Sequence, residues 1–132
     1  MAKVKILTAA EAANLVEDGM TVSTNGFVAC DLPEELTSAL EKRFLETGSP
    51  KNLTYFYAAG QGNRDGSGAD HFAHEGMLSR LFCSNLSLAN SIYPHIHRND
   101  FALFMAPQGV MSHMMRAIAG KKAGVLTEVG LR

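Results

Sequence analysis

With 132 residues, of which 46% are apolar and 19% charged, the chain has the size and composition of one globular domain, which excludes a disordered segment. Twelve basic and 13 acidic residues give a net charge of −1, which excludes the broad basic surface of a nucleic-acid-binding protein. No apolar run approaches the ~20 residues of a membrane span. We therefore expect a cytoplasmic protein with no membrane or nucleic-acid partner, in which Cys30 and Cys83 are reduced thiols.

Two helices and a strand are predicted in the first 50 residues. Thr8-Ala9-Ala10-Glu11 is a capping box that begins a helix, and Gly19 is placed as the residue that closes it. A β-branched strand over residues 21–25 runs into a turn at Gly26. Asp31 is predicted to cap a second helix that opens with Pro33 and ends at Gly48. The buried stripe of that helix is expected to consist of Leu36, Ala39, Leu40, Phe44 and Leu45.

The rest of the chain alternates between strand and helix patterns. Residues 53–58 predict a central strand that is buried on both faces, and a loop with four glycines follows over residues 59–69. The remaining expectations are a helix over 70–80, strands over 81–83 and 101–105, a helical stretch over 86–93, and a last helix over 109–119. This order indicates an open, mainly parallel α/β sheet with helices on both faces. Residues 124–130 resemble the entry into a further strand, so the domain is expected to be truncated at its C-terminus.

Three glycine turns are predicted to meet at one edge of the sheet. They are residues 25–31, 60–62 and 107–109, and each follows a strand. In a parallel sheet such turns gather beyond the carboxyl ends of the strands, where main-chain amides can bind an anion. Each glycine is equally explained as a requirement of the backbone, and none of the turns matches a phosphate loop or a dinucleotide fingerprint.

Metal binding and thiol chemistry are not expected. His71 and His74 could share a helix face, and His95 and His97 could alternate along a strand, but no third ligand is defined and residues 94–100 indicate a solvated connection. Cys30 has no base that the sequence places beside it.

The turns and their neighbouring motifs resemble one known family. The motifs are Gly26-Phe27-Val28 with Leu32-Pro33-Glu34-Glu35-Leu36, residues 41–54, Ala58-Ala59-Gly60-Gln61-Gly62, residues 71–76, and Pro107-Gln108-Gly109-Val110-Met111-Ser112-His113. Together they cover almost the whole chain and resemble the type I coenzyme A transferases, in particular the acetate or propionate CoA-transferase group.

The resemblance implies that residues 1–132 form an N-terminal, alpha-type CoA-transferase domain. Such enzymes move CoA from a short-chain acyl-CoA to a free carboxylic acid through a glutamyl-CoA thioester. The glutamate nucleophile belongs to a second half, on the same longer chain or a separate subunit, and none of the 8 glutamates of this chain is assigned to that role. The chain alone is therefore expected to be inactive and to form homo-oligomers.

The resemblance also implies a wall that faces the nucleophile. Its residues would be Gly26, Phe27, Val28, Gly60, Gln61, Gly62, Gln108 and Gly109. Gln108 would lie near the reacting thioester, and the alternative is that it caps the last helix. No metal and no permanently bound cofactor are expected, and coenzyme A enters as part of the substrate.

Four positions depart from the family pattern, namely Ala29, Asp31, Ser84 and Met105. They support an alternative in which the chain is a non-catalytic half-domain that binds acyl-CoA or a protein. A sugar-phosphate isomerase on a similar fold is a weaker alternative, because architecture does not fix function.

Overall fold

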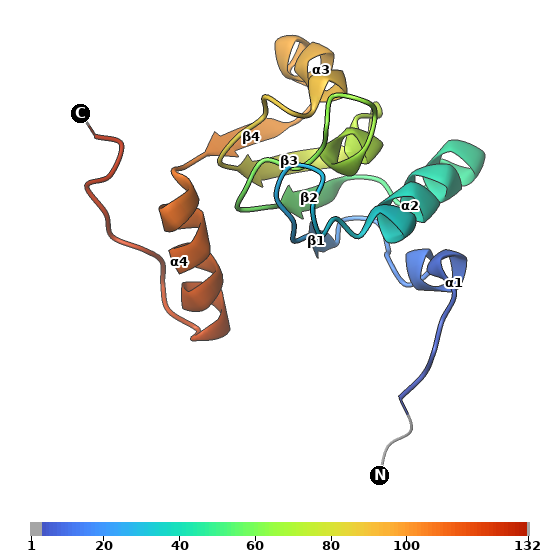
Figure 1. Cartoon of the computed structure of the whole chain (residues 1–132), viewed down its shortest axis with the longest axis horizontal. Helices are drawn as coiled ribbons and strands as arrows, with labels where there is room; N and C mark the ends of the chain where they lie inside the picture. The colour runs from blue at the N-terminus through green and yellow to red at the C-terminus, as the bar shows by residue number, and fades with distance from the viewer. Residues whose placement is uncertain (1–3, 132) are drawn as a thin grey trace.

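A computed structural model describes residues 4–131 as a parallel four-stranded sheet with helices (Figure 1). The elements in chain order are α1 (Ala9–Ala13), β1 (Thr21–Ser23), α2 (Glu34–Thr47), β2 (Leu53–Phe56), η1 (Gly68–Phe72), β3 (Leu78–Cys83), η2 (Asn90–Ile92), α3 (Tyr93–Arg98), β4 (Ala102–Met105) and α4 (Gln108–Ala119). The strands lie in the order β1-β2-β3-β4, and all three pairings are parallel. The predicted fold class is confirmed.

The N-terminal helices begin and end mostly as predicted. The Thr8 hydroxyl accepts the amide of Glu11, and the Glu11 carboxylate accepts the amide of Thr8, so the capping box is present. α1 nevertheless ends at Asn14, and the prediction that Gly19 closes it is wrong. α2 ends at Gly48 in the left-handed conformation, as expected.

Two details predicted for α2 are also wrong. Its N-cap is Pro33, which has no side chain able to accept an amide, whereas Asp31 lies two residues earlier in a left-handed turn. The buried side of the helix includes Thr37, while Leu36 and Leu45 are exposed. The buried face of α2 is therefore narrower than the one predicted from its leucines.

The main core lies on the side of the sheet that carries α1, α2 and α3. The central strand β2 supplies Leu53 and Tyr55, both fully buried, and β3 adds Leu81. The Tyr55 ring stacks on Phe72 of η1 with ring centroids 3.9 Å apart. Burial of such aromatic and aliphatic surface is the main favourable term in folding.

The middle of the chain is less helical than expected. The predicted helix over 70–80 is wrong, because η1 ends at Phe72 and β3 already begins at Leu78. The predicted helical stretch over 86–93 contains only η2 and the first residue of α3. α3 itself occupies most of the predicted solvated connection, and its last turn carries His95, which bonds Asp100.

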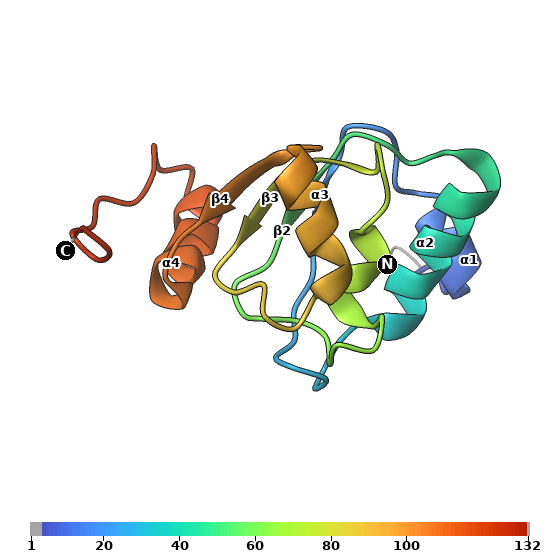
Figure 2. The same cartoon turned by 90° about the horizontal axis from the view of Figure 1, so that it is seen from above.

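α4 lies on the other side of the sheet from α3, beside the end of β4 (Figure 1 and Figure 2). Phe56, Phe82 and Phe104 form a stacked row across β2, β3 and β4, with centroid distances of 6.1 and 4.6 Å. The row ends at Phe104, which is 49% exposed, so this side of the sheet is only partly covered.

Residues 124–130 form no strand, contrary to the expectation, and follow α4 as an irregular segment. Within residues 4–131, no helix is both long and apolar enough to cross a membrane.

Candidate functional site

Two of the three predicted glycine turns are joined directly. Val28 and Gln61 form a parallel bridge in which the Val28 amide donates to the Gly60 carbonyl at 2.8 Å and the Gly62 amide donates to the Val28 carbonyl at 2.9 Å. The bridge keeps the β1–β2 register: Thr21 pairs with Thr54 and Val28 with Gln61, and the partners in each pair are 33 positions apart. The two strands therefore separate after Ser23 and Phe56 and rejoin at the turns.

Glycine is needed in these turns because the backbone is crowded. Gly26 has φ +123°, and a Cβ there would lie 2.5 Å from Leu32 Cδ2. Gly62 has φ +124°, and a Cβ there would lie 2.8 Å from the Leu88 carbonyl oxygen. Both positions combine an unfavourable φ for other residues with a steric clash.

A hollow of about 360 Å³ opens beside the joined turns. Its lining contains Phe27, Val28, Gly60 and Gln108 of the predicted wall together with Ser84, Asn85, Ser87 and Leu88. The last four residues follow β3, and the sequence analysis did not assign them to the site. The sequence could have indicated them, since Ser84 and Asn85 are polar residues directly after a buried strand.

The segment after β3 is held to the glycine loop and to its own turn. The Arg64 amide donates to the Leu88 carbonyl at 3.1 Å, and its Nε donates to the Ser87 carbonyl at 3.0 Å. The Asn85 side chain accepts both the amide and the hydroxyl of Ser87. Ser84, one of the departures from the family pattern, donates to the Ala58 carbonyl. These bonds give the hollow a fixed polar rim.

Gln108 is the first residue of α4 and has an exposed side chain on the hollow. The helix has no side-chain cap, so the alternative that Gln108 caps it is wrong. The first amides of a helix lack acceptors within the helix, and the side-chain amide of Gln108 adds a further donor. Gly109 lines a separate hollow of about 510 Å³ between α4 and the C-terminal segment. Gln108 therefore places a side-chain amide and the start of α4 at the hollow.

The side chain of Gln61 lies in the interior and is 2% exposed. It belongs to a neutral network of Thr24, Tyr55 and Gln61. The Thr24 hydroxyl donates to Gln61 Oε1 at 2.6 Å, and Gln61 Nε2 donates to the Thr24 carbonyl at 3.1 Å. The Tyr55 hydroxyl lies 2.7 Å from the Thr24 hydroxyl, and burial raises the pKa of Tyr55. All three side chains are therefore uncharged near neutral pH.

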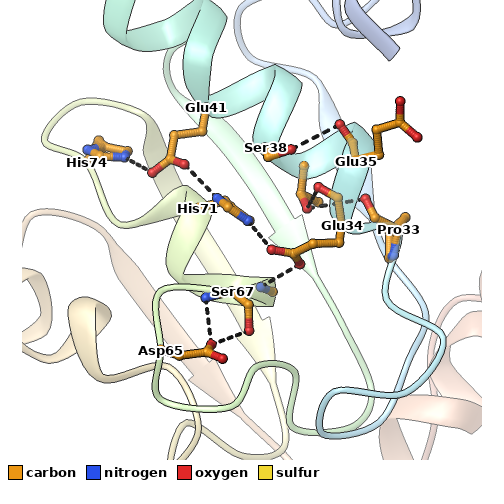
Figure 3. Close-up of polar contacts among 11 residues, drawn as sticks. Pro33, Glu34, Glu35, Ser38, Glu41, Asp65, Ser67, His71 and His74 are labelled. Carbon is orange, nitrogen blue, oxygen red and sulfur yellow. Dashed lines mark hydrogen bonds and ion pairs between the residues drawn. The ribbon is translucent and has the colours of Figure 1, made fainter. Parts of the chain in front are cut away.

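A second, ionic network of Glu34, Glu41, His71 and His74 connects α2 to the segment around η1 (Figure 3). His71 lies between Glu41, which contacts its Nδ1, and Glu34, which contacts its Nε2, both at 2.6 Å. His74 Nε2 lies 2.6 Å from the second oxygen of Glu41, and the Gly68 amide donates to the second oxygen of Glu34. Sequence analysis placed both histidines on a helix and missed their partners.

The ionic network shifts two pKa values in opposite directions. Burial alone would lower the pKa of His71, but its hydrogen bonds with Glu34 and Glu41 raise it overall. Burial alone would raise the pKa of Glu41, but its contacts with His74 and His71 lower it overall. The charged forms are thus favoured, and the network joins α2 to the glycine loop through ion pairs.

The remaining candidate groups are the metal-ligating side chains and the two cysteines. No group of three His, Cys, Asp or Glu side chains in residues 4–131 has the arrangement of a metal site. Cys30 is exposed in the first turn, while Cys83 is buried and its burial raises the pKa of the thiol to about 11. A protonated thiol is a poor nucleophile.

Comparison with known protein families gives one match that spans the chain. The model of the coenzyme A transferase family matches residues 6–131. Caffeate CoA-transferase of Acetobacterium woodii is 33% identical over 127 residues, which are 96% of this chain and 24% of that protein. Acetate CoA-transferase YdiF of Escherichia coli K12 is 28% identical over 130 residues, which are 98% of this chain and 24% of that protein.

A shorter relative and a solved structure agree with this match. The alpha subunit of the acetoacetyl-CoA:acetate/butyrate CoA transferase of Clostridium acetobutylicum is 25% identical over 96% of this chain and 55% of that protein. The crystal structure of a thioester complex of YdiF with CoA, from E. coli O157:H7, has a TM-score of 0.87 and 26% identity over 95% of this chain and 26% of that chain. The chain thus spans about a quarter of the length of its first relatives.

Proposed function

Because the chain belongs to the coenzyme A transferase family, we propose that it is the N-terminal part of an acyl-CoA:carboxylate CoA-transferase. The complete enzyme would move CoA from a short-chain acyl-CoA to a free carboxylic acid. The observation that carries the proposal is the hollow, because it joins Gln108 to the turns at Val28 and Gly60 within a chain that the family model matches along its length.

The proposed mechanism uses a glutamate on the part of the protein outside this chain. That carboxylate attacks the acyl-CoA carbonyl, CoA leaves as a thiolate, and the thiolate then attacks the resulting mixed anhydride to give a glutamyl-CoA thioester and the first acid. The second acid reverses these steps. None of the residues that line the hollow is a glutamate, which supports a nucleophile from elsewhere. Coenzyme A is then part of the substrate, and the chain holds no cofactor of its own.

The chain itself would supply an oxyanion donor and a wall. Attack on the thioester builds negative charge on the carbonyl oxygen, and a preorganised amide donor stabilises it. The amides of Val28 and Gly62 already donate to main-chain carbonyls, so they shape the wall. The side-chain amide of Gln108 lines the hollow at the start of α4, and we assign it as the oxyanion donor.

The experiment replaces Gln108 in the complete enzyme, in which this chain is joined by the remainder of the transferase. Gln108→Ala should lower kcat by ~10²–10³, the usual loss for one oxyanion donor, with little change in melting temperature. Ser112→Ala, on an exposed face of the same helix, is the matched control and should retain full activity. Full activity of Gln108→Ala would overturn the assignment.

A second measurement uses the 132-residue chain without the remainder. It should not transfer CoA from acetyl-CoA or propionyl-CoA to a carboxylate, because the covalent step lacks its nucleophile. Turnover above the buffer rate would contradict this proposal. Binding of acyl-CoA by the complete protein without any turnover would instead favour the non-catalytic half-domain.

The proposed partner is the second half of the transferase. Phe104 and Met105, which are 49% and 55% exposed, lie one residue before the turn that carries Gln108 and would lie beside that partner. We further propose that copies of the chain associate when the second half is absent. Sedimentation of a monodisperse monomer at high concentration would contradict this association.

A further inference from the structure

The neutral network is a set of mutual hydrogen bonds beneath the hollow. The Thr24 hydroxyl lies 2.7 Å from the Tyr55 hydroxyl and donates to Gln61 Oε1 at 2.6 Å, and the Tyr55 hydroxyl also donates to Gln61 Oε1 at 3.1 Å. The Gln61 amide then donates back to the Thr24 carbonyl at 3.1 Å. Since consecutive hydrogen bonds polarise one another in a buried site, the three groups act as a unit.

Gln61 and its two neighbours hold the first part of the first glycine turn, residues 25–28, from both sides. Thr24 directly precedes the turn, and its hydroxyl and carbonyl are both bonded to the Gln61 side chain. Val28 lies in the middle of the turn, and it is bonded through its amide and carbonyl to Gly60 and Gly62, the two neighbours of Gln61. Thr24 and Val28 can therefore shift only if their bonds to residues 60–62 break.

We propose that Gln61 is a positioning residue for the transferase reaction. Through Thr24 it holds the 25–28 turn so that Phe27 and Val28 face Gln108 across the hollow. Gln61 touches no substrate, because its side chain is buried away from the hollow. This inference rests on the proposed function, and a misplacement of about 1 Å at a reacting centre costs about 10²-fold in rate.

Gln61→Met in the complete enzyme is the first test. Methionine keeps the length and removes all three polar contacts, so kcat should fall about tenfold to a hundredfold while KM for the acyl-CoA changes less than threefold. A residue with a purely structural role would lower the melting temperature and leave kcat per folded enzyme unchanged. That result would overturn the proposal.

Two variants of Thr24 test whether its hydroxyl is needed for the rate. Thr24→Ser keeps the hydroxyl between Tyr55 and Gln61 and should retain kcat within about twofold. Thr24→Val keeps the shape without the hydroxyl and should lower kcat about tenfold. Equal kcat values for the two variants would contradict the inference. Tyr55→Phe, a milder change, should give a smaller loss in the same direction, and it keeps the test open if Gln61→Met does not fold.

Hydrogen–deuterium exchange separates this inference from the function on which it rests. In Gln61→Met, peptides that cover residues 24–30 and 60–64 should exchange at least tenfold faster, while peptides from α2 should not change. Unchanged exchange in the two turns would overturn the inference even if transfer is observed. Absence of transfer by the unaltered complete enzyme would overturn the proposed function, and with it the role of Gln61 in the reaction.

Discussion

The neutral and ionic networks hold two ends of the same glycine-rich segment by different means. The neutral network fixes Gln61, at the start of the segment, with groups that are almost fully buried. The ionic network fixes Gly68, His71 and His74, at its end, through carboxylates that water reaches, since the Glu34 side chain is 44% exposed (Figure 3). The end that shapes the hollow is thus the uncharged one.

The difference teaches where charge can be used in this fold. A fully buried ion pair loses much of its hydration energy, whereas a partly exposed pair keeps part of it. Ion pairs on α2 can therefore hold the loop, but their strength changes with pH. The neutral network contains no group that titrates near neutral pH, so it keeps the wall of the hollow constant while the ionic network responds to pH.

The largest expected effect comes from Gly62→Ala, which lies between the two networks. A Cβ there would lie 2.8 Å from the Leu88 carbonyl and 2.9 Å from the Ser67 carbonyl at φ +124°. We expect a loss of about 3 kcal/mol in the free energy of unfolding, because clash and backbone strain add. Gly66→Ala is the control: it has φ +90° but open space around a Cβ, and should lose only about 1 kcal/mol. Chemical denaturation of both variants measures the difference, and equal losses would contradict the steric argument.

The next effect is that of His71→Gln, and it should depend on pH. The pKa of His71 is raised in the folded protein above its ordinary value of 6.5. Its contribution to stability is therefore complete below pH 6.5 and is lost as the pH rises through the pKa of the folded state. The pKa of Glu41 is lowered below its ordinary value of 4.5. Its contribution to stability is therefore complete above pH 4.5 and is lost as the pH falls through the pKa of the folded state. The variant should therefore lose most, about 2 kcal/mol, between these two pH values, and less at pH 8.

Thermal melts of His71→Gln and the unaltered chain over this pH range provide the measurement. Replacement of an exposed histidine such as His113 is the control and should give no such profile. A difference in melting temperature that stays constant from pH 5 to pH 8 would show that protonation of His71 adds nothing to stability.

The smallest effect is expected for Thr24→Val in the neutral network. The substitution removes both hydrogen bonds of the Thr24 hydroxyl. The Tyr55 hydroxyl and Gln61 Oε1 lie 3.1 Å apart, however, and can still bond each other. The loss should be about 1 kcal/mol and should be the same at pH 5 and pH 8. A loss that varies with pH, measured in the same melts, would remove the contrast between the networks.

Local signals predicted the fold where they agreed with the packing. The capping box at Thr8, the left-handed Gly48 and the buried strand around Tyr55 all have one physical explanation that can be seen in the sequence. The region after Gly68 could not be predicted in this way. Apolar and polar residues around His71 have helical spacing, but η1 stops at Phe72 because burial of that ring on Tyr55 and the ion pairs to α2 fix the backbone instead.

The placement of the candidate site residues could be predicted in part. Glycines after strands indicated the turns, and the hollow contains Phe27, Val28, Gly60 and Gln108. The direction of the Gln61 side chain could not be inferred, because it depends on Thr24 and Tyr55 from two other parts of the chain. Likewise, the contribution of Ser87 and Leu88 depends on their bonds to Arg64.

The pairing between β1 and β2 has the same offset before and after the two segments separate, and this limits changes in chain length. β1 and β2 separate after Ser23 and Phe56 and rejoin at Val28 and Gln61 with the same offset. The two arms of this opening are residues 24–27 and 57–60. One residue inserted into or deleted from either arm would shift the bridge by one place and turn its side chains to the opposite face. Insertions and deletions here are therefore tolerated only in pairs, one in each arm, so this opening can vary in its side chains but is held to a fixed length.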